Sequence, residues 1–123
     1  MRLERVVLAQ GAYFVATGLA PFASRRLFEA VTGPKREWWL VQTVGATVTA
    51  VGAGLIMAAV RGDPPLEVLV IGAGTSAGLA AIDVVYVVKR RIAPTYLVDA
   101  GIEVGLLAAL MGASSARRPL DGA

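Results

Sequence analysis

The chain has 123 residues, enough for one domain, and 56% of them are hydrophobic while 17% are charged. About a quarter of the residues of a soluble domain are charged, so this balance excludes an ordinary water-soluble protein. The net charge of +3 is modest, and the basic residues flank apolar runs, which argues against a nucleic-acid partner. Cys and His are both missing, which excludes thiol nucleophiles, disulfides, His general bases and zinc sites built on these side chains.

The charged residues divide the chain into four apolar runs, each long enough for a transmembrane helix. A bilayer core needs about 20 helical residues, with a range of roughly 17 to 25. Helices satisfy their backbone hydrogen bonds internally in lipid, and these runs do not alternate as barrel strands would. We therefore predict an all-α integral membrane bundle with up-down topology over residues 1–113, and a polar tail over 114–123. The runs are Val6–Ala23, Trp38–Val60, Leu66–Val88 and about Thr95–Met111.

The first run also resembles a secretory signal, because Arg2 and Arg5 precede it. No small-x-small cleavage site ends the run, however, and Arg25 and Arg26 follow it. We expect a retained transmembrane helix, and cleavage is the alternative.

The loop over residues 24–37 contains a short amphipathic segment. Leu27, Phe28 and Val31 can share one helical face, and the helix is expected to end at Gly33. The sequence predicts a short helix in the lipid headgroup layer between the first two transmembrane helices. The residues expected at the headgroups are Arg25, Arg26, Lys35, Arg36, Trp38, Trp39, Lys89, Arg90 and Arg91.

The two remaining loops, residues 61–65 and 89–94, are short turns. Seven of the 12 Lys and Arg residues lie on the side of the first and third loops, and five lie on the other side. Because basic loops favour the cytoplasm, this small excess predicts that the first and third loops are cytoplasmic.

Small residues recur at four-residue spacing in every run and predict close helix packing in lipid. We expect a compact bundle with little room for an internal pore, so a transport path would require a homodimer. The predicted packing faces are Ala12, Ala16 and Ala20; Ala46, Ala50 and Gly54; Gly72, Ser76 and Ala80; and Gly101, Gly105 and Ala109.

The segment 70–78 is rich in glycine and is similar to a dinucleotide-binding fingerprint. That motif requires a strand, a turn and then a helix, with an acidic residue about 20 positions later. Here the glycines lie within one apolar run, and the position about 20 residues later holds Ile92 to Pro94, with no acidic residue. We therefore predict helix packing and no bound cofactor.

Three carboxyl groups, those of Asp83, Asp99 and Glu103, lie inside the last two runs. An acid at a helix centre costs roughly 2.5 to 3.5 kcal/mol on insertion scales, so such groups face protein or trapped water. The short third loop makes these two helices antiparallel neighbours, which brings Asp83 and Asp99 to similar depth. Glu103 lies one turn deeper on the face of Asp99. We predict one acidic pocket that opens toward the first and third loops.

Other polar side chains enter the membrane from the same side. Gln42, Tyr86 and Tyr96 complete the predicted ligand- or proton-binding set, whereas Gln10 lies toward the opposite end of its helix and is expected outside it. In the alternative interpretation, Asp83 and Asp99 form ion pairs with the basic residues 89–91 and only brace the hairpin.

Two resemblances bear on function. Small multidrug transporters are similar in length, but their central Glu on the first helix is missing, and Gln10 is the strongly polar residue there. The segment Arg5–Gly11 with Phe14 and Gly18 resembles the first helix of DoxX-like proteins, a match of about one helix. This resemblance implies a four-helix bundle of the bacterial inner membrane, sometimes associated with redox or quinone partners.

These observations favour a small membrane protein that binds a small or lipid-like ligand in the acidic pocket. The alternatives are a dimeric proton- or cation-coupled transporter and a structural or accessory membrane subunit. No nucleophile elbow or metal motif is present, so the sequence argues against catalysis, and we predict no metal site.

Overall fold

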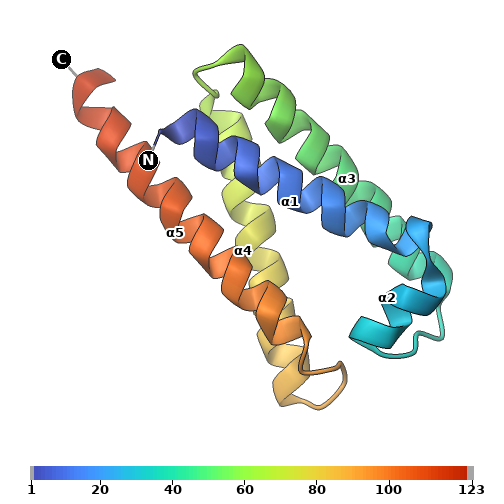
Figure 1. Ribbon diagram of the computed structural model, residues 1–123. Coiled ribbons are helices and arrows are strands. Elements are labelled where there is room, and N and C mark those ends of the chain that lie inside the picture. Colours follow the sequence, from blue (N-terminus) through green and yellow to red (C-terminus); the bar gives the residue numbers. More distant parts are fainter. Residues whose placement is uncertain (1, 122–123) are drawn as a thin grey trace.

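The computed structural model describes residues 2–121, with side chains described as far as Ser115, and this part of the chain is built from helices (Figure 1). The spans α1, α3, α4 and Tyr96–Ser115 of α5 are long and apolar enough to cross a membrane. The predicted all-α bundle of four transmembrane helices is confirmed, and the chain is a small integral membrane protein. The helices are α1 (Leu3–Ala23), α2 (Arg25–Thr32), α3 (Trp38–Arg61), α4 (Leu66–Val88) and α5 (Tyr96–Asp121).

The helix ends follow the apolar runs closely, except at the carboxyl end of the chain. The predicted polar tail over 114–123 begins inside α5, whose backbone is helical as far as Asp121. Polar side chains mark where the lipid ends, but backbone hydrogen bonds can continue a helix into water. The remaining residues of that tail, 122 and 123, lie outside the described residues.

The transmembrane helices form two closely packed pairs, α1 with α3 and α4 with α5. The pairs meet tightly at the end of the molecule near the chain termini, where Leu3, Val7, Leu55, Leu69 and Leu110 belong to one buried cluster. From that end α3 and α4 diverge toward α2 (Figure 1). The apolar core therefore lies at one end of the bundle, and the helix pairs separate at the other.

Glycines allow the backbones of α1 and α3 to touch. A Cβ added at Gly18 would lie 2.6 Å from the Gly45 carbonyl oxygen, and one at Gly11 would lie 2.8 Å from that of Gly52. Each partner glycine is equally close in return, since a Cβ at Gly45 would lie 2.5 Å from the Gly18 carbonyl oxygen. No side chain fits at these distances, so this interface requires glycine.

The predicted packing faces are confirmed on α4 and wrong on the other helices. Gly72, Ser76 and Ala80 are buried. In helices this rich in small residues, four-residue spacing recurs on several faces and does not select one. The seven-residue spacing of the glycines in α1 and α3 marks the real interface. Members of the predicted faces that are exposed in the chain are Ala12, Ala16, Ala46, Ala50, Gly54, Gly101 and Gly105.

The predicted interfacial helix is α2. The Ser24 hydroxyl caps it by accepting a hydrogen bond from the Leu27 backbone N–H at 3.2 Å. Gly33 ends it with φ of 91°, a left-handed conformation that favours glycine. None of its residues is buried, and Leu27 and Val31 are 66% and 56% exposed. An exposed apolar face on a charged helix suits the headgroup boundary.

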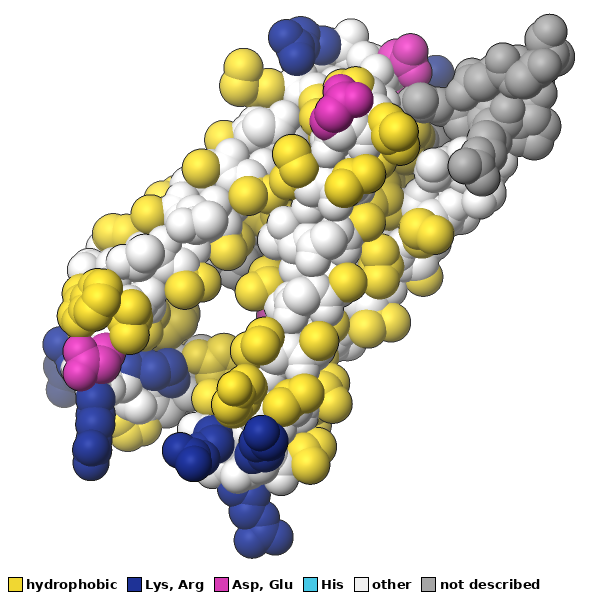
Figure 2. Space-filling model, turned by 180° about the vertical axis from the view of Figure 1, so that it is seen from behind, with side chains coloured by type: hydrophobic (Ala, Val, Ile, Leu, Met, Phe, Trp, Pro, Cys, Tyr) yellow, Lys and Arg dark blue, Asp and Glu magenta, His cyan; other side chains and the backbone are white. Residues whose placement is uncertain are grey.

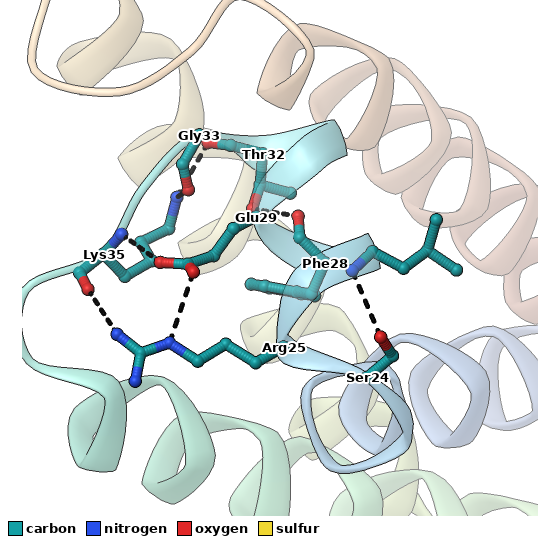
Figure 3. A network of polar contacts seen from close by, with 8 residues as sticks. Ser24, Arg25, Phe28, Glu29, Thr32, Gly33 and Lys35 are labelled. Carbon is teal, nitrogen blue, oxygen red and sulfur yellow. Dashed lines mark hydrogen bonds and ion pairs between the residues drawn. The ribbon is translucent and has the colours of Figure 1, made fainter.

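A polar network folds the following loop back onto α2 (Figure 3). The Glu29 carboxylate accepts hydrogen bonds from the Lys35 backbone N–H at 2.6 Å and from Arg25 Nε at 3.2 Å. Arg25 Nη2 in turn donates to the Lys35 carbonyl at 3.1 Å. Glu29 therefore holds both the helix and the loop.

Acid is expected to loosen this loop. The hydrogen bond from the Lys35 N–H, with the charge and N–H of Arg25, lowers the pKa of Glu29 below its ordinary value of 4.5. Because the folded pKa is the lower one, the stabilisation is complete above the ordinary value and is lost as pH falls through the folded pKa. The NMR shift of the Lys35 amide proton should follow this transition. A Glu29→Gln variant should not show it, and an unchanged transition in that variant would contradict the assignment.

Candidate functional site

A cavity of about 600 Å³ lies between the two helix pairs, at the end where they diverge. The bundle is therefore less compact at this end than we expected, because α3 and α4 diverge from the turn that joins them. The lining residues are mainly apolar, and they come from all five helices and the loop before α5: Tyr13, Thr17, Gly18, Pro21, Phe28, Val31, Thr32, Leu40, Val41, Val44, Gly45, Val48, Leu79, Asp83, Thr95, Tyr96, Val98, Asp99 and Glu103.

The cavity has an opening at the side of the bundle (Figure 2), and the opening toward the first and third loops stays a prediction. Leu40, Val44 and Val98 line it and are also exposed on the outer surface of α3 and α5. Figure 2 shows an opening between α3 and α4, with an acidic side chain visible at its edge. Basic side chains gather at the end of the molecule below this opening (Figure 2).

The end facing those two loops is covered by α2. Phe28, Val31 and Thr32 contribute to the cavity wall. The Thr95 hydroxyl donates to the Val31 carbonyl at 2.8 Å, which ties α2 to the start of α5. The Lys35 ammonium lies 5.3 Å from the centre of the Tyr96 ring and adds a second contact between these segments.

The structure brings Asp83, Asp99, Glu103 and Tyr96 to this one cavity. Asp83 and Glu103 are 6% and 1% exposed. The Asp83 and Asp99 side chains are close enough to interact with each other. The three acids therefore share one buried site, and their role as a ligand site stays a prediction.

Gln42 and Tyr86, which we also assigned to the pocket, are not among the lining residues. Val41 and Gly45 present the cavity face of α3, and Gln42 lies about 100° around the helix from Val41. The Tyr86 ring is on the outside of α4, where the Lys89 ammonium lies 5.5 Å from its centre. Helical rotation therefore places both side chains away from the cavity.

The first helix supplies site residues that the prediction missed. The Tyr13 hydroxyl donates a hydrogen bond to Oδ1 of Asp99. Thr17, one turn further along α1, also lines the cavity. With Gln10, these residues follow i, i+3, i+7 spacing, which marks one polar face on an otherwise apolar helix. That pattern was the signal in the sequence.

Gln10 is fully buried and belongs to the polar cluster, contrary to our expectation. Its side-chain amide donates to the Ser76 hydroxyl at 2.8 Å and to the Gly72 carbonyl at 2.9 Å. The Ser76 hydroxyl then donates to Oε1 of Glu103 at 2.8 Å. A chain of hydrogen bonds thus joins α1, α4 and α5. A Cβ at Gly72 would lie 2.6 Å from the Gln10 side-chain oxygen, so this glycine serves helix packing.

Some polar atoms of this cluster have no partner. Oε1 of Gln10, Oδ2 of Asp83 and Oε2 of Glu103 are buried and accept no hydrogen bond from the described residues. An unpaired buried acceptor loses the free energy of its hydration, so each atom calls for a donor.

The ion pairs that would brace the hairpin are not formed. Among the side chains described, the ion pair found is Arg25–Glu29, and none joins Asp83 or Asp99 to residues 89–91. Within the same part of the chain, no set of three acidic groups is arranged to hold a metal ion. Asp83, Asp99 and Glu103 therefore line the cavity without an ion pair to any Lys or Arg that the structure describes.

No protein-family model matches the chain, and neither a curated protein nor a solved structure matches it. The DoxX-like resemblance of the first helix stays a prediction.

Proposed function

We propose that this membrane protein binds a small lipid-like amphiphile in the cavity. The observation that carries the proposal is a cavity with mainly apolar walls and a cluster of polar groups, in which Asp83 and Glu103 are buried and Asp99 and Tyr13 are half-buried. Ligand sites are typically apolar clefts in which a few placed polar groups orient the ligand. The apolar part of the amphiphile packs on the walls, and its polar group meets the acids.

The size and the position of the cavity support this function. A volume of about 600 Å³ lies within the range of roughly 300 to 1,000 Å³ that is typical of small-molecule sites. The sideways opening beside Leu40, Val44 and Val98 gives a membrane-dissolved molecule a direct route in. Acids inside a membrane are costly and mark functional sites by default, and these acids form no ion pair with the basic side chains described.

We also propose how the protein is oriented in the membrane. The basic residues of α2 and of the 89–91 turn cluster at one end of the molecule, below the opening (Figure 2). We place that end at the cytoplasmic headgroups of a bacterial inner membrane, because basic loops favour the cytoplasmic side. The ligand would then sit in the cytoplasmic half of the bilayer, under α2.

Filling the cavity is expected to prevent binding. Val41 is half-buried and lines the cavity, so Val41→Trp should occupy ligand space. Native mass spectrometry of the protein released from native-lipid nanodiscs should show a retained amphiphile in the wild type and at least about tenfold less in the variant, the loss expected when about 1.4 kcal/mol of binding is removed.

Met57→Trp is the matched control, since Met57 lies on the same helix, is 62% exposed and does not line the cavity. It should retain the amphiphile as the wild type does. Equal retention in the two Trp variants, with equal thermal stability, would contradict the proposed site. The absence of a retained amphiphile from the wild type would contradict it too.

A further inference from the structure

The donors next to the acids are already used by the protein. The Tyr13 hydroxyl donates to Asp99, and the Ser76 hydroxyl donates to Glu103. The Gln10 amide group donates to Ser76 and to the Gly72 carbonyl. None of these groups has a proton left to offer to a ligand that accepts hydrogen bonds.

The threonine hydroxyls of the cavity wall are used in the same way. Thr17 donates to the Tyr13 carbonyl at 2.9 Å, Thr32 to the Phe28 carbonyl at 2.8 Å and Thr95 to the Val31 carbonyl at 2.8 Å. These bonds run within a helix or between neighbouring segments, so the hydroxyl protons point at the backbone and away from the ligand space.

What remains free around the acids is a set of acceptors. Oδ2 of Asp83 and Oε2 of Glu103 are buried and without a partner among the described residues. An ionised carboxylate can only accept hydrogen bonds. No Lys or Arg among the described side chains lines the cavity, and the nearby Lys35 ammonium donates to the Thr32 and Gly33 carbonyls at 2.7 and 2.8 Å. Among the described residues, the site is therefore rich in carboxyl oxygens, and the Tyr96 hydroxyl is the lining donor that is not already used.

We propose that the amphiphile is a cation, a hydrocarbon-bearing amine whose protonated nitrogen carries at least one N–H. This inference rests on the proposed function and names the ligand class of that same site. The N–H groups donate to the carboxyl groups of Asp83 and Glu103, whose Oδ2 and Oε2 atoms are covered in this structure and turn toward the cavity when the amine enters. Tyr13 holds Asp99 in place. An inorganic ion would leave the apolar walls uncovered, and a carboxylate or phosphate head would be repelled by the acids.

The test uses the wild-type protein in phosphatidylcholine nanodiscs and four probes with one tail length. These are dodecylammonium, dodecyltrimethylammonium, dodecanol and dodecanoate, each titrated by calorimetry below its micelle concentration. Empty nanodiscs supply the background for partition into lipid. Dodecylammonium should bind at least about tenfold more tightly than dodecanol, because hydrogen bonds to charged groups are stronger than neutral ones. The trimethyl probe, which lacks N–H, should lose most of that advantage, and dodecanoate should bind most weakly.

The outcomes separate the two proposals. If dodecanol or dodecanoate binds as tightly as dodecylammonium, the cavity binds amphiphiles but the cation inference is overturned. If the trimethyl probe binds as tightly as dodecylammonium, the need for an N–H is refuted. If no probe binds above the empty-disc background, the proposed function fails with the inference.

Variants add a second readout. Glu103→Gln and Asp83→Asn should each reduce the preference for dodecylammonium over dodecanol by about tenfold, while dodecanol binding is retained. Glu67→Gln is the matched control, because Glu67 is an exposed acid at the start of α4. If all three variants keep the wild-type preference, the assignment of the amine to these two carboxylates is wrong.

Discussion

Gly52→Ala is expected to lower the free energy of unfolding by about 1 to 3 kcal/mol, the usual cost of overpacking a close contact. The new Cβ would lie 2.7 Å from the Gly11 carbonyl oxygen and 2.8 Å from the Val15 backbone nitrogen. Both neighbours are backbone atoms of α1, which cannot turn aside as a flexible side chain would. The α1–α3 pair must therefore separate. Equilibrium unfolding in mixed micelles of an anionic and a non-ionic detergent measures the change.

Gly54→Ala is a close control for this effect. Gly54 lies two residues further along α3, and no atom lies within 4 Å of a Cβ added there. The same chemical change should alter stability by less than about 0.5 kcal/mol, as is usual for exposed positions. An equal loss in the two variants would show that the contact with α1 does not determine the result, because Ala favours a helix over Gly at both positions.

The ends of the transmembrane helices could be predicted because lipid enforces them. The apolar run Leu66–Val88 coincides with α4, and the run starting at Trp38 begins α3 at that residue. The hydropathy of the sequence shows where a segment passes from lipid to water. Within lipid the segment must form a helix, because only a helix satisfies its backbone hydrogen bonds internally. The stop at Gly33 was equally clear, since the sequence places glycine where α2 ends with positive φ.

The rotation of each helix could not be predicted in the same way. Tyr86 and Ser76 both belong to α4, yet Tyr86 faces outward and Ser76 is fully buried. In lipid an apolar residue is equally acceptable on either face, so hydropathy does not select the inner one. Only polar groups, which are costly in lipid, indicate which face of a helix points inward. For this reason the sequence correctly predicted that Asp83 and Glu103 lie together. Gln10 was misplaced because its depth was considered without its partners.

The separation of the two helix pairs could not be predicted from the sequence either. A short turn such as 61–65 makes α3 and α4 neighbours at one end, but it does not fix the angle between them. That angle depends on the glycine contacts of α3 with α1, which draw α3 away from α4. The cavity is therefore a consequence of close packing elsewhere in the bundle.

Breaking the hydrogen-bond chain at its centre is expected to destabilise the protein. Ser76→Ala removes the acceptor of the Gln10 amide and the donor to Glu103, bonds of 2.8 Å each in a fully buried site. Leaving such groups unpaired costs about 1 to 3 kcal/mol. Thr75→Ala, the neighbouring control, removes a hydroxyl that donates to the Ile71 carbonyl of its own helix, and it should cost less than about 0.5 kcal/mol.

A double-mutant cycle with Gln10→Leu isolates the contact between α1 and α4. Interhelical hydrogen bonds in membranes average about 0.6 kcal/mol and reach about 1.7 kcal/mol, so a coupling energy in this range is expected for Gln10 and Ser76. Gln10→Leu combined with Thr75→Ala should show none, because those side chains share no hydrogen bond. Additive effects of Gln10→Leu and Ser76→Ala would mean that the two side chains act independently. In that case the polar chain would not connect α1 to the carboxyl group of Glu103.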